Sequence, residues 1–189
     1  MSIASCAVAA VAVFPNATVA TSSGSLPLPV VMVSIAGAES GWVDDAAGDY
    51  GLPGPACGGY TSWGLWQIHS VHSAYLQSAT GSADPCVWAA WLSVPANCAI
   101  AALAVLGVGP NLNLGAWTTY TGGQWTAHLA AAQQAVAAVT PSGGEGGGMV
   151  RLVAAVAPVA GVLFLAGVSV LAVGVGVEEE RRADGVNGV

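Results

Sequence analysis

Glu39 is the residue of this sequence best suited to acid–base chemistry. It lies near the end of the apolar stretch VVMVSIAGAES, it is the only glutamate before Glu145, and no Lys or Arg precedes Arg151. The negative end of a helix dipole, apolar neighbours and the lack of a cation each favour a protonated carboxyl. A carboxyl that is protonated near neutral pH can donate its proton to a glycosidic oxygen. The alternative is an ordinary solvated glutamate at the end of a helix.

The remaining polar and aromatic residues favour an uncharged sugar as the ligand. All seven tryptophans fall between Trp42 and Trp125. Sugar rings stack on aromatic faces, and an amide such as that of Gln67 can both donate to and accept from an N-acetyl group. We expect Trp63 and Trp66 in the cleft. At least four tryptophans are expected in the core, among them Trp88, Trp91 and Trp117.

No metal or cofactor is expected from the sequence. His69 and His72, in the segment HSVH, share one face of a helix, but no third ligand lies near them in the sequence. The cysteines form no CxxC pair. We expect Cys86 and Cys98 to form a disulfide in an oxidising compartment, and the alternative is buried free thiols.

Four segments resemble the lytic transglycosylase and goose-type lysozyme superfamily, which includes phage virion lysins and actinobacterial wall enzymes. They are AESGW (38–42), AAGDYG (46–51), SWGLWQIH (62–69) and AWTTYTGG (116–123). The resemblance covers roughly residues 27–139 and implies a lysozyme-like fold. It also implies that Glu39, in the ESG motif, is the catalytic acid. The substrate-binding residues are then expected to be Ser40, Ser62, Trp63, Trp66, Gln67 and Tyr120.

The resemblance implies a reaction that uses a single carboxyl group. In the transglycosylases one Glu acts first as acid and then as base, while the substrate's own 6-hydroxyl replaces water. An ordinary hydrolase would need a second carboxylate. The candidates are Asp44, Asp45 and Asp49, of which Asp49 matches the family position near the cleft. We favour the single-acid mechanism, because no second Glu is present in this part of the chain.

The elements that would position these residues are mostly helical. Apolar runs and stop signals predict helices over 2–14, 29–40, 97–106 (capped by Asn97) and 125–139, and a Gly/Pro-rich loop over 48–59. The sequence thus predicts a mainly α, α+β lysozyme-like catalytic domain over 1–139. Residues 1–26 hold either its first packed helix or a targeting segment.

The C-terminal part reads as a membrane anchor. Residues 140–149 form a Gly-rich linker, 150–177 are predicted to be a transmembrane helix, and 178–189 are a charged tail. The stretch 152–177 carries no charge, and 26 residues of helix would be about 39 Å long, enough to cross a hydrocarbon core of about 30 Å. The alternative is a buried core helix.

Composition excludes some partners and favours others. Charged residues make up only 7% of the chain, the net charge is −7, and the three basic residues all lie at or beyond Arg151. Nucleic acid is therefore not an expected partner. The expected function is cleavage of peptidoglycan glycan strands by an enzyme anchored in the membrane of a virion or a bacterial envelope, beside other envelope or virion proteins. The alternative is a non-catalytic glycan-binding or structural virion membrane protein.

Overall fold

The computed structural model describes residues 2–107 and 112–140, which form a mostly helical domain with a few short strands. The predicted transmembrane helix, the charged tail and all of the linker but Thr140 lie outside the described residues. No single helix among those described is long and apolar enough to cross a membrane. Helices α4 (Pro85–Leu92) and α5 (Pro95–Leu106) reach that length only as a pair, which is bent by 108°.

Helix α2 (Leu28–Ser40) is the central element of the domain, and its prediction is confirmed. Pro29 lies in its first turn, and Gly41 ends it in a left-handed conformation with its N–H donated to Gly37 O at 3.0 Å. Residues 28–37 are all buried, which explains the unbroken apolar run. This helix packs against α1 (Ile3–Val13), the 3₁₀ helix η3 (Gln124–His128) and α7 (Leu129–Val139).

The first 27 residues contain a helix and a hairpin. Helix α1 ends where predicted, because Phe14 precedes a proline and takes an extended conformation. Strands β1 (Thr18–Thr21) and β2 (Gly24–Pro27) then pair antiparallel and lead into α2. Cys6, Ala7 and Ala10 of α1 are fully buried, so this helix is part of the domain core.

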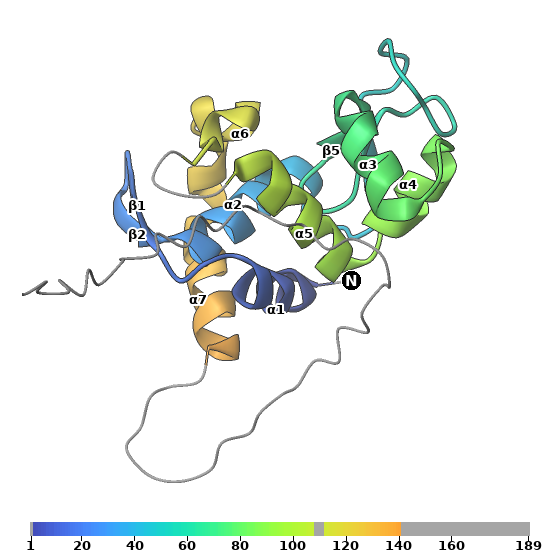
Figure 1. Ribbon diagram of the computed structural model, residues 1–189. Coiled ribbons are helices and arrows are strands. Elements are labelled where there is room, and N and C mark those ends of the chain that lie inside the picture. Colours follow the sequence, from blue (N-terminus) through green and yellow to red (C-terminus); the bar gives the residue numbers. More distant parts are fainter. Residues whose placement is uncertain (1, 108–111, 141–189) are drawn as a thin grey trace, which may run out of the picture. The chain divides into compact units, whose positions relative to one another are not determined.

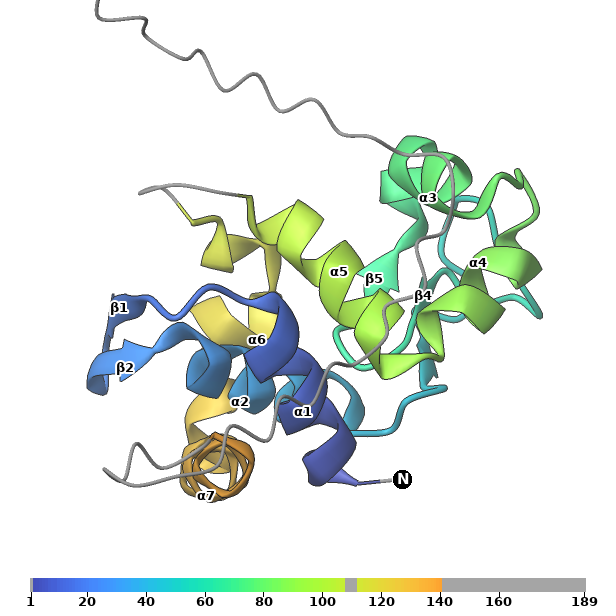
Figure 2. The ribbon, with the colours of Figure 1, turned by 60° about the horizontal axis from the view of Figure 1, so that its bottom comes forward.

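A second group of elements follows α2. Strands β3 (Ala47–Gly48), β4 (Ser62–Trp63) and β5 (Ile68–His69) form a small antiparallel sheet in that order. The 3₁₀ helix η1 (Ser70–His72), α3 (Ser73–Thr80) and then α4 and α5 come next. Figures 1 and 2 show α3, α4 and the small sheet at one end of the domain, the β1–β2 hairpin at the other, and α5 between them. The 3₁₀ helix η2 (Leu114–Ala116) and the one-turn helix α6 (Thr118–Thr121) precede η3.

Two predicted helix starts were wrong. Helix α5 begins at Pro95, and Asn97 is not its cap, since the Asn97 amide donates to Trp91 O at 3.1 Å. The helix predicted over 125–139 is a 3₁₀ helix up to His128 and an α-helix only from Leu129. Proline at the first helical position sets the start of α5 better than the polar residue two positions later.

The prediction that Trp63 and Trp66 line the cleft is wrong. Trp63 is 3% exposed and Trp66 is fully buried. The Trp66 indole N–H donates to Met32 O of α2 at 2.8 Å, and its ring lies edge-on to Phe14. A buried indole needs such a partner, so this tryptophan fixes the small sheet to the central helix. Five tryptophans are buried: Trp63, Trp66, Trp88, Trp117 and Trp125. Trp91, which was expected in the core, is half-buried.

The predicted Cys86–Cys98 disulfide is also wrong, because Cys86 pairs with Cys57. Cys86 is exposed in the first turn of α4, facing the loop that holds Cys57. Cys98 is a buried free thiol on the core side of α5, and burial raises its pKa to about 12. Cys6 is likewise buried and free.

Candidate active site

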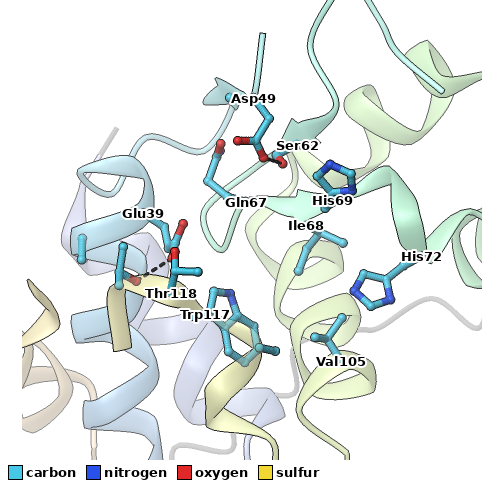
Figure 3. A pocket seen from close by; sticks show the side chains of 14 residues that line it. Glu39, Asp49, Ser62, Gln67, Ile68, His69, His72, Val105, Trp117 and Thr118 are labelled. Carbon is cyan, nitrogen blue, oxygen red and sulfur yellow. Dashed lines mark hydrogen bonds between the residues drawn. The ribbon is translucent and has the colours of Figure 1, made fainter. Parts of the chain in front are cut away.

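A cleft of about 510 Å³ opens beside the C-terminal end of α2. Its walls come from α2, the three-stranded sheet, η1, α5 and the segment from η2 to α6 (Figure 3). The lining residues are Ala38, Glu39, Gly48, Asp49, Ser62, Gln67, Ile68, His69, His72, Val105, Ala116, Trp117, Thr118 and Thr119. Residues far apart in the sequence thus meet at the predicted acid.

Glu39 is half-buried in this cleft and is held by a short hydrogen bond. The Thr119 hydroxyl donates to Glu39 Oε1 at 2.5 Å. Burial raises the pKa of Glu39 above its ordinary value, and the negative charge of Asp49 raises it further, while the bond from Thr119 acts in the opposite direction. Burial is the largest of these effects, so the pKa of Glu39 is raised overall, as the sequence predicted.

Asp49 is the second carboxylate of the cleft, and its conformation is fixed by its neighbours. The Ser62 hydroxyl donates to Asp49 Oδ2, and the Thr61 hydroxyl donates to the Asp49 carbonyl oxygen at 3.1 Å. Thr61 Oγ1 lies 3.3 Å from His69 Nε2. His69 Nδ1 accepts the Val71 N–H at 2.9 Å, so in the neutral ring the proton is on Nε2, directed at Thr61. The Ser62 hydroxyl, which was predicted to bind substrate, is bonded to Asp49 instead.

Gln67 lines the cleft as predicted, with one half of its amide already used. Its Nε2 donates to Gly64 O at 2.9 Å and to Ala46 O at 3.2 Å. The carbonyl Oε1 remains as an acceptor beside Gly48, at a position that a side chain on Gly48 would occupy. Gln67 can therefore accept a hydrogen bond from a ligand N–H, but its own N–H groups are not free to donate.

The backbone is strained at two of these residues. Only three non-glycine residues among those described have a positive φ, namely Trp42, Asp49 (58°) and Gln67 (47°). Two of the three line the cleft. Such conformations cost about 1–3 kcal/mol each and gather at functional sites, where the surrounding structure holds them in place.

Besides Trp63 and Trp66, four residues proposed from the sequence lie outside the cleft lining. The Ser40 hydroxyl donates back to Ala36 O of its own helix, and the Tyr120 ring stacks on Trp125. Asp44 is 3% exposed near Ser5 of α1, and Asp45 borders a separate pocket beside Trp63 and Cys57. The only second carboxylate that the described residues bring to Glu39 is Asp49.

The sequence analysis missed other lining residues. Thr119 lies one position before the Tyr120 that the motif suggested, and the single turn of α6 directs it towards α2 while Tyr120 turns to Trp125. Trp117 is a core residue that also borders the cleft, and its indole N–H donates to Trp66 O at 2.9 Å. His69 and His72 were weighed only as metal ligands. Burial and the neighbouring His69 both lower the pKa of His72.

The charge of the cleft restricts what it can bind. The described residues include no Lys or Arg, and two carboxylates face the cavity. Phosphate groups and other strong anions therefore find no cationic partner here. Within the described ranges no group of three or more His, Cys, Asp or Glu side chains is placed to hold a metal ion. The cleft offers one carboxyl with a raised pKa, a second carboxylate, an amide oxygen, hydroxyl groups and two imidazoles, a set suited to acid–base chemistry on an uncharged polar ligand.

Comparison with known proteins identifies no relative: no protein-family model, no curated protein and no solved structure matches this chain.

Proposed function

We propose that this protein cleaves the glycan strand of peptidoglycan at MurNAc–GlcNAc bonds, as a lytic transglycosylase with a lysozyme-like fold and Glu39 as its acid. The observation that supports this most is the environment of Glu39. Its carboxyl is half-buried in a cleft without cations, and burial raises its pKa. The choice of peptidoglycan rests on the ESG and GLWQI motifs, which contribute Glu39 and Gln67 to the same cleft.

The proposed reaction needs Glu39 twice. The protonated carboxyl gives its proton to the glycosidic oxygen as the bond from that oxygen to C1 of the sugar breaks. The 6-hydroxyl oxygen of the same sugar then bonds to C1, and its proton returns to the Glu39 carboxylate. The Thr119 hydroxyl, 2.5 Å from Oε1, stabilises the carboxylate between the two steps. Gln67 Oε1 is available to hold an N-acetyl N–H of the substrate.

A second candidate is hydrolysis by the same cleft, and the position of Asp49 favours it. Asp49 lines the cavity with Glu39, and its charge affects the pKa of Glu39. In an inverting hydrolase Asp49 would take a proton from the attacking water while Glu39 protonates the leaving oxygen. The non-catalytic alternative is a protein that binds glycan in this cleft and releases no products.

The proposed location follows from the sequence. The charge-free stretch within 150–177 would anchor the enzyme in a lipid membrane, either of a virion or of a bacterial envelope, with the domain facing the wall. An anchor would compensate for the lack of basic residues, since the domain has no cationic surface with which to hold an anionic wall.

The test is mass spectrometry of the muropeptides released from purified peptidoglycan by the full chain. Glu39→Gln should reduce product formation at least about 100-fold. Asp45→Asn makes the same change from acid to amide outside the cleft and should leave product formation unchanged. Anhydro-muramic ends would indicate transglycosylation, whereas reducing ends, lost in Asp49→Asn, would indicate hydrolysis. Full activity in Glu39→Gln would refute the catalytic role, and a folded wild type that binds glycan without cleaving it would favour the binding protein.

A further inference from the structure

We propose that Tyr50 and Tyr60 form a stacking platform that binds the glycan strand where it leaves the cleft. For the identity of its ligand this inference rests on the proposed function. Tyr50 is 73% exposed and Tyr60 is 37% exposed. Their ring centroids are 5.1 Å apart and the rings are inclined at 63°. Two neighbouring aromatic rings open to solvent supply the surface on which sugar rings stack.

The loop between β3 and β4 holds the two rings in place. Cys57 and Tyr60 exchange two backbone hydrogen bonds of 3.0 Å, and Gly51 N donates to Gly59 O at 2.9 Å. The Cys57–Cys86 disulfide ties the loop to α4. Gly59 has a φ of 88°, and a side chain there would collide with the Tyr50 ring, so that ring lies directly over the Gly59 backbone. A ring that is already fixed loses little conformational entropy when it binds.

The chain joins the platform to one wall of the cleft. Tyr50 follows Asp49 in the chain, and Tyr60 stands two residues before Ser62. Asp49 and Ser62 both line the cleft and are hydrogen-bonded to each other. The two tyrosines therefore extend from the pair of chain segments that form one wall of the candidate site. A polymer that runs through the cleft must leave it over the surrounding surface, and this wall leads to the tyrosines.

The chemistry of the platform favours an uncharged sugar. No Lys or Arg is present among the described residues, so an anionic ligand gains no ion pair. Each tyrosine combines an apolar face for sugar C–H groups with a hydroxyl for hydrogen bonds. Leu52, 51% exposed, adds apolar surface in the same loop. The ligand class is the N-acetylated glycan already proposed for the cleft.

The test measures binding of N-acetylglucosamine oligomers to the full chain carrying Glu39→Gln, so that the ligand stays intact. Tyr50→Ala should raise the Kd of the hexasaccharide about five- to tenfold, while the Kd of the disaccharide changes by less than about twofold. Tyr60→Ala should act in the same direction. Tyr50→Phe keeps the ring and should restore binding. Val94→Ala, a change at another exposed apolar residue, should have no effect.

A second measurement needs no change at the platform. With ring-labelled tyrosines in the same Glu39→Gln chain, the hexasaccharide should shift the NMR signals of Tyr50 and Tyr60 and leave that of Tyr75, in α3, in place. An unchanged Kd in Tyr50→Ala together with unshifted ring signals would overturn the platform, even if the wild type cleaves peptidoglycan. Conversely, the protein could bind the hexasaccharide through Tyr50 and yet not cleave peptidoglycan. That result would confirm the platform and refute the proposed enzymatic function.

Discussion

Replacing Thr119 by valine should move the pH profile of the enzyme in a predictable direction. The Thr119 hydroxyl donates to Glu39 Oε1 and so stabilises the ionised carboxylate. Valine has nearly the same shape but no hydroxyl. Without this bond the pKa of Glu39 rises further. If protonated Glu39 is the acid, activity in the variant should persist to higher pH.

The size of the shift follows from the strength of the bond. A hydrogen bond to a charged group contributes about 1.5–3 kcal/mol when well shielded. Glu39 is only half-buried, so screening by solvent lowers this to about 1 kcal/mol. One pH unit corresponds to about 1.36 kcal/mol, and we therefore expect the alkaline limb of kcat/KM to move up by about half to one pH unit.

The assay is the initial rate of soluble product release from peptidoglycan over about pH 4 to 8, with the full chain. Thr121→Val is the matched control, because Thr121 is an exposed residue of the same helix whose hydroxyl donates to Thr118 O and does not reach Glu39. Comparing the two variants also removes any effect on the pH profile that comes from titration of the substrate. A limb that stays in place or moves to lower pH in an active Thr119→Val variant would refute the role of Glu39 as the acid.

Further predictions concern stability and the cleft. Burial raises the pKa of Glu39 in the folded protein above its ordinary value of 4.5, so the folded state loses stability as the pH rises through that raised pKa. Gln cannot ionise and avoids this loss. Glu39→Gln should therefore have the melting temperature of the wild type near pH 4 and a higher melting temperature than the wild type at pH 7. An equal or lower melting temperature at pH 7 would contradict the burial argument. Removing both Cys57 and Cys86, which are 29 residues apart, should lower the free energy of unfolding by about 3–4 kcal/mol in a denaturant titration, and addition of a reductant to the wild type should reproduce the loss. Gly48→Ala should displace the Gln67 amide and weaken binding of N-acetylated oligosaccharides. Stability should fall by about 1–3 kcal/mol, because the amide loses its bonds to Gly64 O and Ala46 O. Unaltered binding would remove Gln67 from the site. Activity should vary little between about 50 and 200 mM salt, since the domain has no cationic surface, and a steep loss over that range would reveal an ionic contact that the sequence does not predict.

Part of this structure could be predicted from the sequence, because it depends on residues that are close together in the chain. The apolar run, Pro29 and Gly41 predict α2 almost to the residue, because capping and burial act over a few positions. A lone Glu at the end of that helix, in a segment without cations, predicts the upward direction of its pKa. The GLWQI segment points to Gln67, whose place in the cleft follows from the turn that begins at Gly64.

Tertiary structure decided the features that depend on distant segments. Neither the spacing of the cysteines nor their neighbours shows that Cys86 faces Cys57 while Cys98 turns into the core. Tryptophans beside a motif can belong to either the cleft or the core, and the hydrogen bond from Trp66 to Met32 O, across 34 positions, places it in the core.

The same holds for the partners of the acid. Thr119 lies 80 positions from Glu39, and only the packing of α6 near the end of α2 joins them. Asp44, Asp45 and Asp49 have the same chemistry, and only the resemblance to a family favoured Asp49. In the structure the turn after β3 brings Asp49 to the cleft, while Asp44 turns towards α1. The ends of α1 and α2 are set by neighbours in the chain, whereas the cysteine pairing, the burial of tryptophans and the partners of Glu39 are set by which surfaces meet when the chain folds.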